Sequence, residues 1–384
     1  MHPDNQSAST SQNSGGILIE SAELRVVELP LVTPFVISTG TMTHKTFPLL
    51  VLKGEGLEGY AEAVMDPYPD YLEETVAGAM TFLRDVLLPA VIGKRFNTPY
   101  ELQSLLAPWR GNHMAKAVVE MALWDIWSKS LGTPLKAVIG GVGDSVSVGV
   151  SIGIAPIEKT LERVAEVVGQ GYHRTKLKIA QGHDIALVEA VRNKFPDIKL
   201  TVDANTDYGM NDLPILQALD EFKLDYIEQP LAFDDIHDHA KVQAALKTAI
   251  CLDESIRTPS DARKALEIGA ARVINIKVGR VGGFAAARAI HDLCAAFDVP
   301  VWCGGMLESG IGRAHNIHLS TMSNFKKPGD TSSASRYFER DIIHEALEVE
   351  NGLMAVPNNG AGIGVTLDYD YLERVTQHKE EMGA

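Results

Sequence analysis

Five ionisable residues recur along the middle of the chain at an almost constant interval. They lie 25, 25, 25 and 24 residues apart, each near the end of a short apolar run that predicts a β-strand: Lys178, Asp203, Glu228, Asp253 and Lys277. In successive parallel βα units, residues at one offset meet at the same barrel mouth. Three carboxylates gathered there would raise one another's pKa unless a cation lies among them. All-oxygen ligands favour a hard ion, so we expect Mg²⁺, with Mn²⁺ as a substitute.

The two lysines of this set predict proton transfer at carbon. If Lys178 ends the second strand of an eight-stranded barrel and Lys277 ends the sixth, their amines face each other across the mouth. A carboxylate substrate on the metal would then present its α-carbon to one amine on each side. Lys176 lies on the same strand face as Lys178, and its charge, together with that of the metal, should lower the pKa of Lys178 from about 10.4. The predicted chemistry is α-proton abstraction through an enediolate.

Short apolar runs alternate with helical stretches after Gly141 and predict repeated βα units. Seven units in a row favour a closed barrel, and an open doubly wound sheet is the alternative. No G-x-G-x-x-G motif follows the first strand, which weakens that alternative. The expected strands are 145–153, 174–179, 200–204, 226–229, 250–253, 273–278 and 299–303, and the expected helices between them are 160–169, 184–194, 212–222, 236–249 and 282–297.

The residues before the barrel predict a smaller α+β domain. Two alternating runs, 23–32 and 47–54, flank a turn-rich segment, so we expect a hairpin-like pair with a loop at 34–45. Helical spacing follows at 72–88, 99–107 and 113–131. We therefore expect four parts: a disordered tail at 1–16, an α+β capping domain at 17–140, the barrel at 141–340, and a C-terminal segment at 341–384 that returns to the capping domain.

Composition narrows the function classes. The chain has 35 Lys and Arg against 50 Asp and Glu, a formal net charge of −15, which argues against nucleic-acid and anionic-membrane partners. Its longest uncharged stretches are interrupted by Pro, Gly or Asn, so no segment is expected to span a bilayer. The 3 cysteines form no C-x-x-C pair, and residues 1–16 lack the apolar core of a secretory signal. We expect a cytoplasmic enzyme acting on a small carboxylate.

Several motifs extend this pattern beyond the five residues. They are MAKAVVEMALWDIWSKSLGTPL before the barrel, KLK at 176–178, VDAN at 202–205, IEQPL at 227–231, LDES at 252–255, IKVGRVGG at 276–283 and WCGGMLESGIGRAHN at 302–316. With these motifs the chain resembles the enolase superfamily, and within it the group of o-succinylbenzoate synthases and N-acylamino acid (N-succinylamino acid) racemases. The resemblance runs over nearly the whole chain after the tail.

This resemblance implies a fold and a set of roles. The fold is a (β/α)₇β modified TIM barrel with an α+β capping domain built from both chain ends, in a homo-oligomer. The implied metal ligands for Mg²⁺ are Asp203, Glu228 and Asp253. Lys178 and Lys277 form the implied acid–base pair, with Lys176 as their electrostatic partner. These roles agree with the chemistry expected from the spacing. The superfamily is known for lysine bases that act together with Mg²⁺.

The resemblance also implies a substrate pocket. A lid is expected from a turn at 34–41 and a loop at 65–71, and Arg280 matches an arginine associated with racemising members. The remaining implied pocket residues are Ser151, Asn205, Gly305, Met306 and Leu307. A salt bridge within a loop is the alternative interpretation of Arg280.

Two reactions fit the same residues. In the synthase, which serves menaquinone biosynthesis, Lys178 would take the α-proton and assist loss of hydroxyl on the same face. In the racemase, Lys178 and Lys277 would exchange protons on opposite faces. We expect o-succinylbenzoate synthase with N-succinylamino acid racemase activity, and the racemase as main role is the alternative.

Other functions explain less of the sequence. A muconate-type cycloisomerase or a dipeptide epimerase would share the metal and the lysines, but the Asp-x-Asp expected of the epimerases is not found near the last strand, which reads GGMLESG. A Schiff-base aldolase on an ordinary TIM barrel would leave the three carboxylates without a role. A metal-stabilised binding protein would leave the opposed lysines without one.

Overall fold

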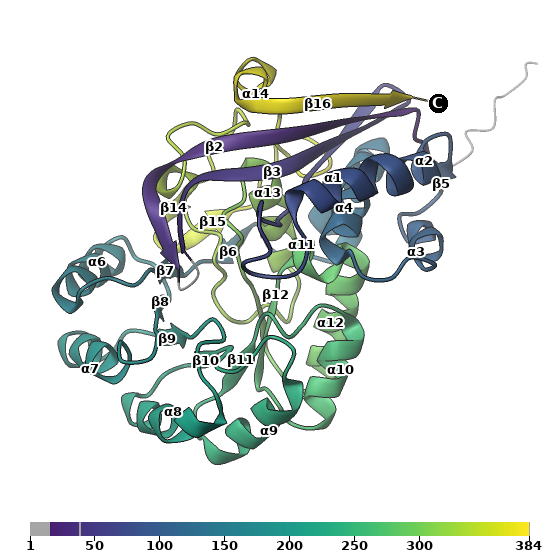
Figure 1. Ribbon diagram of the computed structural model, residues 1–384. Helices are drawn as coiled ribbons and strands as arrows, with labels where there is room; N and C mark the ends of the chain where they lie inside the picture. The colour runs from purple at the N-terminus through teal and green to yellow at the C-terminus, as the bar shows by residue number, and fades with distance from the viewer. Residues whose placement is uncertain (1–15, 38–39, 384) are drawn as a thin grey trace, which may run out of the picture.

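The structure, a computed structural model, describes residues 16–37 and 40–383 (Figure 1). The tail expected at 1–16 lies outside these residues, apart from Gly16. In Figure 1 a ring of short strands and outer helices fills the lower part of the molecule, and an antiparallel sheet covers it from above.

Seven parallel strands form the barrel sheet, and they follow one another in space in the order of the sequence. Each coincides with an expected strand: β7 (Val150–Ile152), β8 (Thr175–Lys178), β9 (Leu200–Asp203), β10 (Ile227–Glu228), β11 (Ile250–Leu252), β12 (Val273–Ile276) and β13 (Val301–Cys303). Lys178, Asp203 and Glu228 are the last residues of their strands, and Asp253 and Lys277 come directly after theirs. All five therefore stand at one end of the sheet, where barrel active sites are built.

A segment without regular secondary structure closes the barrel. Residues 325–330 run between the first and the last strand: Phe325 forms a parallel bridge with Val301, and Gly329 forms one with Val148. The segment takes the eighth strand position, so the architecture is the (β/α)₇β barrel expected from the resemblance.

Helices lie outside the strands, and Figure 1 shows α6 to α10 and α12 around them. They are α6 (Ile157–Gly169), α7 (Ile185–Lys194), α8 (Leu213–Leu219), α9 (Ile236–Ala245), α10 (Pro259–Glu267), α12 (Phe284–Ala296) and α13 (Gly310–Ser320). Four short helical elements accompany them: the α-helical α11 (Val278–Val281) after Lys277, and three 3₁₀ helices. These are η2 (Met210–Asp212) and η3 (Asp220–Phe222) on either side of α8, and η4 (Ala334–Arg336) after the segment that closes the barrel.

Two barrel helices are shorter than the sequence predicted. The helix expected at 212–222 is regular only in α8, because Pro214 belongs in a first helical turn and Lys223 adopts a left-handed conformation with φ 52° after it. The helix expected at 236–249 ends at Ala245, since Leu246 is already extended towards β11.

An antiparallel sheet forms the centre of the capping domain, in the order β16 (Thr376–Gly383), β2 (Ser21–Ile37), β3 (Gly40–Gly54), β4 (Leu57–Glu62). The prediction of a loop at 34–45 is wrong, because β2 and β3 continue to pair as far as Ile37 and Gly40. The register shifts between Pro30 and Phe35. Pro34 falls in this irregularity, where no ladder hydrogen bond is needed, and β-branched residues on either side favour the extended pairing.

Small elements complete the capping domain and its junction with the barrel. The helices are α1 (Val76–Phe82), the π-helical η1 (Leu83–Leu87), α2 (Leu88–Val91), α3 (Glu101–Leu106), α4 (His113–Ser130), α5 (Leu135–Ile139) and α14 (Tyr369–Val375). The short strands are β1 (Ile17–Leu18) with β5 (Arg95–Phe96), and β6 (Ser145–Ser147) with β15 (Leu353–Ala355) and β14 (Val349–Glu350). The helix expected at 72–88 starts later and widens at η1, because Pro89 cannot continue the α-helical hydrogen bonds.

Helix α4 connects the cap to the barrel. It is buried over most of its length, and its Glu120 accepts hydrogen bonds from the first backbone N–H groups of α12, those of Phe284 (2.7 Å) and Ala285 (2.8 Å). A helix begins with N–H groups that have no partner within it, and Glu120 satisfies two of them. This contact fixes the cap over the mouth of the barrel.

The C-terminal strand β16 pairs with β2 along almost its whole length, from Thr376 opposite Val27 to Gly383 opposite Ser21. The exact domain limits expected from the sequence stay a prediction. Of the helices within residues 16–37 and 40–383, none combines the length and apolar character needed to cross a membrane.

Candidate active site

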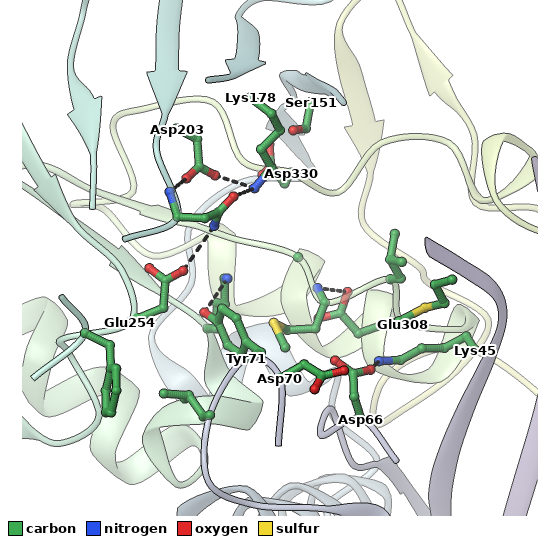
Figure 2. Close-up of a pocket in the computed structure, with 18 of the residues that line it drawn as sticks. Lys45, Asp66, Asp70, Tyr71, Ser151, Lys178, Asp203, Glu254, Glu308 and Asp330 are labelled. Carbon is green, nitrogen blue, oxygen red and sulfur yellow. Dashed lines mark hydrogen bonds and ion pairs between the residues drawn. The ribbon is translucent and has the colours of Figure 1, made fainter. Parts of the chain in front are cut away.

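A cavity of about 490 Å³ lies between the capping domain and the carboxyl ends of the barrel strands (Figure 2). Nine of the predicted site residues line it: Ser151, Lys176, Lys178, Asp203, Asn205, Lys277, Gly305, Met306 and Leu307. Three others do not line it and are almost fully buried next to it: Glu228, Asp253 and Arg280. The structure therefore brings the predicted set together, in two layers.

Lys178 and Lys277 enter the cavity from strands that lie four positions apart in the barrel. Lys178 Nζ lies 2.6 Å from Asp203 Oδ2 and 2.5 Å from Asn205 Oδ1. Lys277 Nζ lies 2.8 Å from Asp253 Oδ2. Burial opposes the charge on Lys277, but the Asp253 carboxylate outweighs it and raises the lysine pKa above its ordinary value. A separate carboxylate thus orients each amine.

Lys176 lies among three carboxylates. Its Nζ is 3.0 Å from Glu228 Oε2, 3.3 Å from Asp203 Oδ2 and 2.8 Å from Asp330 Oδ2. Burial works against its charge, but these acids together hold its pKa well above the ordinary value. Lys176 is therefore a buried cation at the centre of the acidic strand ends.

The three acids expected to bind metal are all paired with basic groups or amides. Burial and the charge of Asp203 raise the pKa of Glu228 to about 8, and Asn275 Nδ2 donates to its Oε1 at 3.0 Å. Asp253 is buried as well, yet Arg280 and Lys277 hold its pKa below the ordinary value. Within the described part of the chain, no three His, Cys, Asp or Glu side chains are gathered closely enough to form a metal site. In the structure, ammonium and guanidinium groups balance these carboxylates.

Glu254 belongs to the same acidic group, and the sequence analysis missed it. It lines the cavity, and its Oε1 accepts a hydrogen bond from Asn205 Nδ2 at 3.1 Å. Its Oε2 is buried without a hydrogen-bond partner among the described residues. Burial and the neighbouring charge of Asp253 raise its pKa to about 7. Its position directly after Asp253, as the second acid of LDES, is the signal that could have identified it.

Asp330 is a second residue that the sequence analysis missed. It ends the segment that closes the barrel, and its backbone N–H donates to Cys303 O at 2.9 Å. Its carboxylate lies between Arg174 Nη2, at 2.6 Å, and Lys176 Nζ. Although Asp330 is largely buried, these two cations hold its pKa below the ordinary value. Its segment has no strand periodicity, so nothing in the sequence marked its place at the mouth.

The loop expected to form a lid at 65–71 does reach the site. The Tyr71 hydroxyl donates to Asp253 Oδ2 at 3.2 Å and accepts from Lys277 Nζ at 2.9 Å. The other expected lid segment, 34–41, includes residues 38 and 39, which lie outside the described residues; its neighbour Met42 lines the cavity. Tyr71 therefore connects the cap directly to Lys277, which follows β12.

The structure places Arg280 beneath the cavity. Its guanidinium pairs with Asp253 and donates to Ile256 O at 3.0 Å and to Asn275 O at 2.7 Å. Burial alone would lower the pKa of Arg280, but the Asp253 carboxylate raises it above its ordinary value. Its contacts are those of a buried salt bridge that supports Asp253, and the predicted contact with substrate stays a prediction.

Two further features shape the cavity. Ser151 Oγ, at the end of the first barrel strand, is buried without a hydrogen-bond partner among the described residues. Gly304 precedes the predicted residues 305–307 and lies close to the amine end of the Lys277 side chain, since a Cβ atom at this position would lie 2.7 Å from Lys277 Cε. The glycine leaves room for the lysine.

Comparisons with known proteins agree with this architecture. Residues 21–140 match the N-terminal domain of the mandelate racemase / muconate lactonizing enzyme family, and residues 159–371 match the enolase C-terminal domain-like family. An N-succinylamino acid racemase of Thermus thermophilus is 54% identical, over 95% of this chain and 99% of that protein. An o-succinylbenzoate synthase of Geobacillus kaustophilus is 50% identical, over 94% and 96%. The crystal structure of an enolase superfamily member from Listeria innocua aligns with a TM-score of 0.93 and 44% identity, over 96% and 99%.

Replacing Asp330 by Asn should destabilise the protein by about 3 kcal/mol at pH 7, because Arg174 and Lys176 would lose a buried counter-charge. The pKa of Asp330 in the folded protein is lower than its value of about 3.9 in the unfolded chain. Its carboxylate therefore contributes to the stability of the fold at a pH above about 3.9. The difference between wild type and Asp330→Asn should therefore be constant at neutral pH and shrink below about pH 4.

Denaturant unfolding of both proteins across this pH range measures the effect. Asp144→Asn is the matched control, because Asp144 forms an exposed pair with Lys136 and its loss should leave the unfolding free energy unchanged. An equally stable Asp330→Asn variant at pH 7 would contradict the interpretation.

Proposed function

The chain belongs to the enolase superfamily, and we propose that it is an o-succinylbenzoate synthase that also racemises N-succinylamino acids. Both reactions begin with removal of a proton from the carbon next to a carboxylate. The observation that carries the proposal is the pair of lysines, Lys178 and Lys277, which line one cavity from strands four positions apart.

In the synthase reaction we assign proton removal to Lys178. Asp203 and Asn205 hold its Nζ in place, and Asn205 is fixed in turn by Glu254. The base must act as a neutral amine, so it must first release a proton. Lys277 stays protonated and stabilises the negative charge that develops on the substrate.

In the racemase reaction each lysine serves one face of the α-carbon. One takes the proton and the other returns a proton from the opposite side. Lys277 is held by Asp253 and Tyr71, so it is as well positioned as Lys178 for this role. Ser151, Asn205 and the loop 305–307 would contact the substrate, and Ser151 Oγ, which has no partner within the described chain, is a donor ready for it.

The acidic strand ends offer the donor chemistry for a divalent cation, which would bind in place of the ammonium and guanidinium contacts that these acids make in the structure. Asp203, Glu228 and Asp253 offer only oxygen donors, the set that Mg²⁺ prefers, and the buried Glu254 Oε2 beside them has no partner among the described residues. Enolase superfamily enzymes generally use Mg²⁺. The ion would supply positive charge next to the substrate carboxylate, which makes the α-hydrogen more acidic.

The racemase as main role is the second candidate. Its support is the N-succinylamino acid racemase of Thermus thermophilus, at 54% identity, against 50% for the synthase of Geobacillus kaustophilus. A cytoplasmic location and a homo-oligomer remain predictions from the sequence.

A paired assay tests the proposal directly. The purified enzyme with Mg²⁺ should both form o-succinylbenzoate by dehydration and racemise an N-succinylamino acid. Lys178→Ala should lower both rates by about 10³-fold or more, because it removes the base. The higher kcat/KM of the wild type identifies the main reaction, and absence of both activities would reject the proposal.

Lys277→Ala should separate the two reactions. Racemisation should fall by about 10³-fold, since one face loses its proton donor and acceptor, while α-proton exchange survives on the other face. In deuterated solvent, the variant should exchange the α-hydrogen of one enantiomer only. Exchange from both enantiomers at equal rates would contradict lysines on opposite faces.

Removal of metal should abolish activity, and added Mg²⁺ should restore it. Asp253→Asn should weaken Mg²⁺ binding by at least about 10-fold, because a ligand charge is lost. Calorimetric titration with Mg²⁺ measures this without reference to activity, and Asp144→Asn serves as the control for a lost surface charge. Identical titrations for wild type and Asp253→Asn would remove Asp253 from the ligand set.

A further inference from the structure

The capping domain contributes a buried cation to the cavity. Lys45, on β3, lines the cavity although its side chain is only 2% exposed. The lysines assigned to chemistry, Lys176, Lys178 and Lys277, come from the barrel strands. Figure 2 shows Lys45 with Asp66 on the side of the cavity away from Asp203 and Lys178. A positive charge therefore stands at each end of the space that a substrate would fill.

The contacts of Lys45 leave it able to bind an anion. Its Nζ lies 2.7 Å from Asp66 Oδ1 and 3.4 Å from Val64 O. A lysine ammonium has three N–H donors, and these contacts use two. Asp66 compensates the buried charge, and the third N–H is left to donate to a ligand of opposite charge at the edge of the cavity.

The other cation that lines this part of the wall contacts backbone carbonyls through both of its terminal nitrogens, and its Nε, which has no partner among the described residues, is buried away from the cavity. Arg313 donates through Nη1 to Ser332 O and through Nη2 to Glu308 O, at 3.1 Å for the second contact. The acids near this end are Asp66, Asp70 and Glu308, and Glu308 accepts from Met306 N at 2.8 Å and from Asn316 Nδ2 at 2.9 Å. Lys45 is therefore the cation best placed to receive an incoming carboxylate.

We propose that Lys45 binds the remote carboxylate of the substrate and so sets the preference for a succinyl group. This inference rests on the proposed function: the substrates of both reactions carry a succinyl chain that ends in a second carboxylate, away from the α-carbon. With the α-carboxylate at the barrel mouth, the chain extends towards the cap. Lys45 then acts on specificity and takes no part in proton transfer.

The ion pair of Lys45 and Asp66 also has a purely structural explanation, and the experiment must distinguish it from carboxylate binding. Asp66 begins the loop that carries Tyr71 over the site, so Lys45 could serve only to anchor that loop. An anchor is broken equally by removing either partner. A binding site for a carboxylate is lost when Lys45 is removed and kept when Asp66 is removed.

The test compares two acyl groups on the same amino acid. N-Succinyl and N-butanoyl derivatives differ only in a carboxylate against a methyl group at the end of the chain. The wild type should prefer the succinyl derivative by about 10- to 100-fold in kcat/KM for racemisation, the size expected for a hydrogen bond to a charged group. A wild-type ratio near one would overturn the inference without any variant.

Variants on both sides of the ion pair then decide between the two explanations. Lys45→Met should bring the ratio close to one, mainly by raising KM for the succinyl derivative, while the rate with the butanoyl derivative persists. Lys45→Arg should keep a clear preference, and Asp66→Asn should keep or increase it, since the competing carboxylate is gone. Equal loss of both substrates in Lys45→Met and Asp66→Asn, with the ratio unchanged, would show an anchor only.

The outcomes also distinguish this inference from the proposed function. If the wild type racemises neither derivative and forms no o-succinylbenzoate, the proposed function fails. If the wild type is active and Lys45→Met keeps the wild-type ratio, the function stands and the role of Lys45 is rejected.

Discussion

The barrel mouth depends on balancing charge where water is largely excluded. Five carboxylates, Asp203, Glu228, Asp253, Glu254 and Asp330, meet five cations, Arg174, Lys176, Lys178, Lys277 and Arg280. Each of these cations contacts at least one of the acids, and a group with a single ionic partner, such as Arg174 beside Asp330, would be left uncompensated if that partner were removed.

The sequence predicted this ring because barrel geometry repeats. Each βα unit, with its strand, helix and two loops, contains about the same number of residues. Residues at a constant spacing in the sequence therefore occupy equivalent positions at the mouth. Lys178, Asp203, Glu228, Asp253 and Lys277 stand at the ends of β8 to β12 for this reason. Ser151, Asn205 and residues 305–307 line the cavity as the resemblance implied, while their roles stay predictions.

Residues that lie outside the regular spacing of the barrel units could not be predicted in the same way. Asp330 and Arg174 meet only because an irregular segment closes the barrel, and the partners of Arg280 depend on how α11 turns after Lys277. In the hairpin of β2 and β3, cross-strand pairing overrides the turn-forming residues that suggested a loop. Lys45 is remote in sequence from every barrel motif, so only the placement of the cap over the barrel brings it to the cavity.

The pairing of β16 with β2 has a consequence for how the chain is made. The two strands are separated by almost the whole sequence, and β16 is the last element of the described chain. The barrel strands and the segment that closes them are complete at residue 330. During synthesis from the N-terminus, the barrel can therefore assemble while β2 still waits, with an unpaired edge, for its final neighbour. Until the ribosome has released residues 376–383, the nascent cap exposes a strand edge that other chains could pair with.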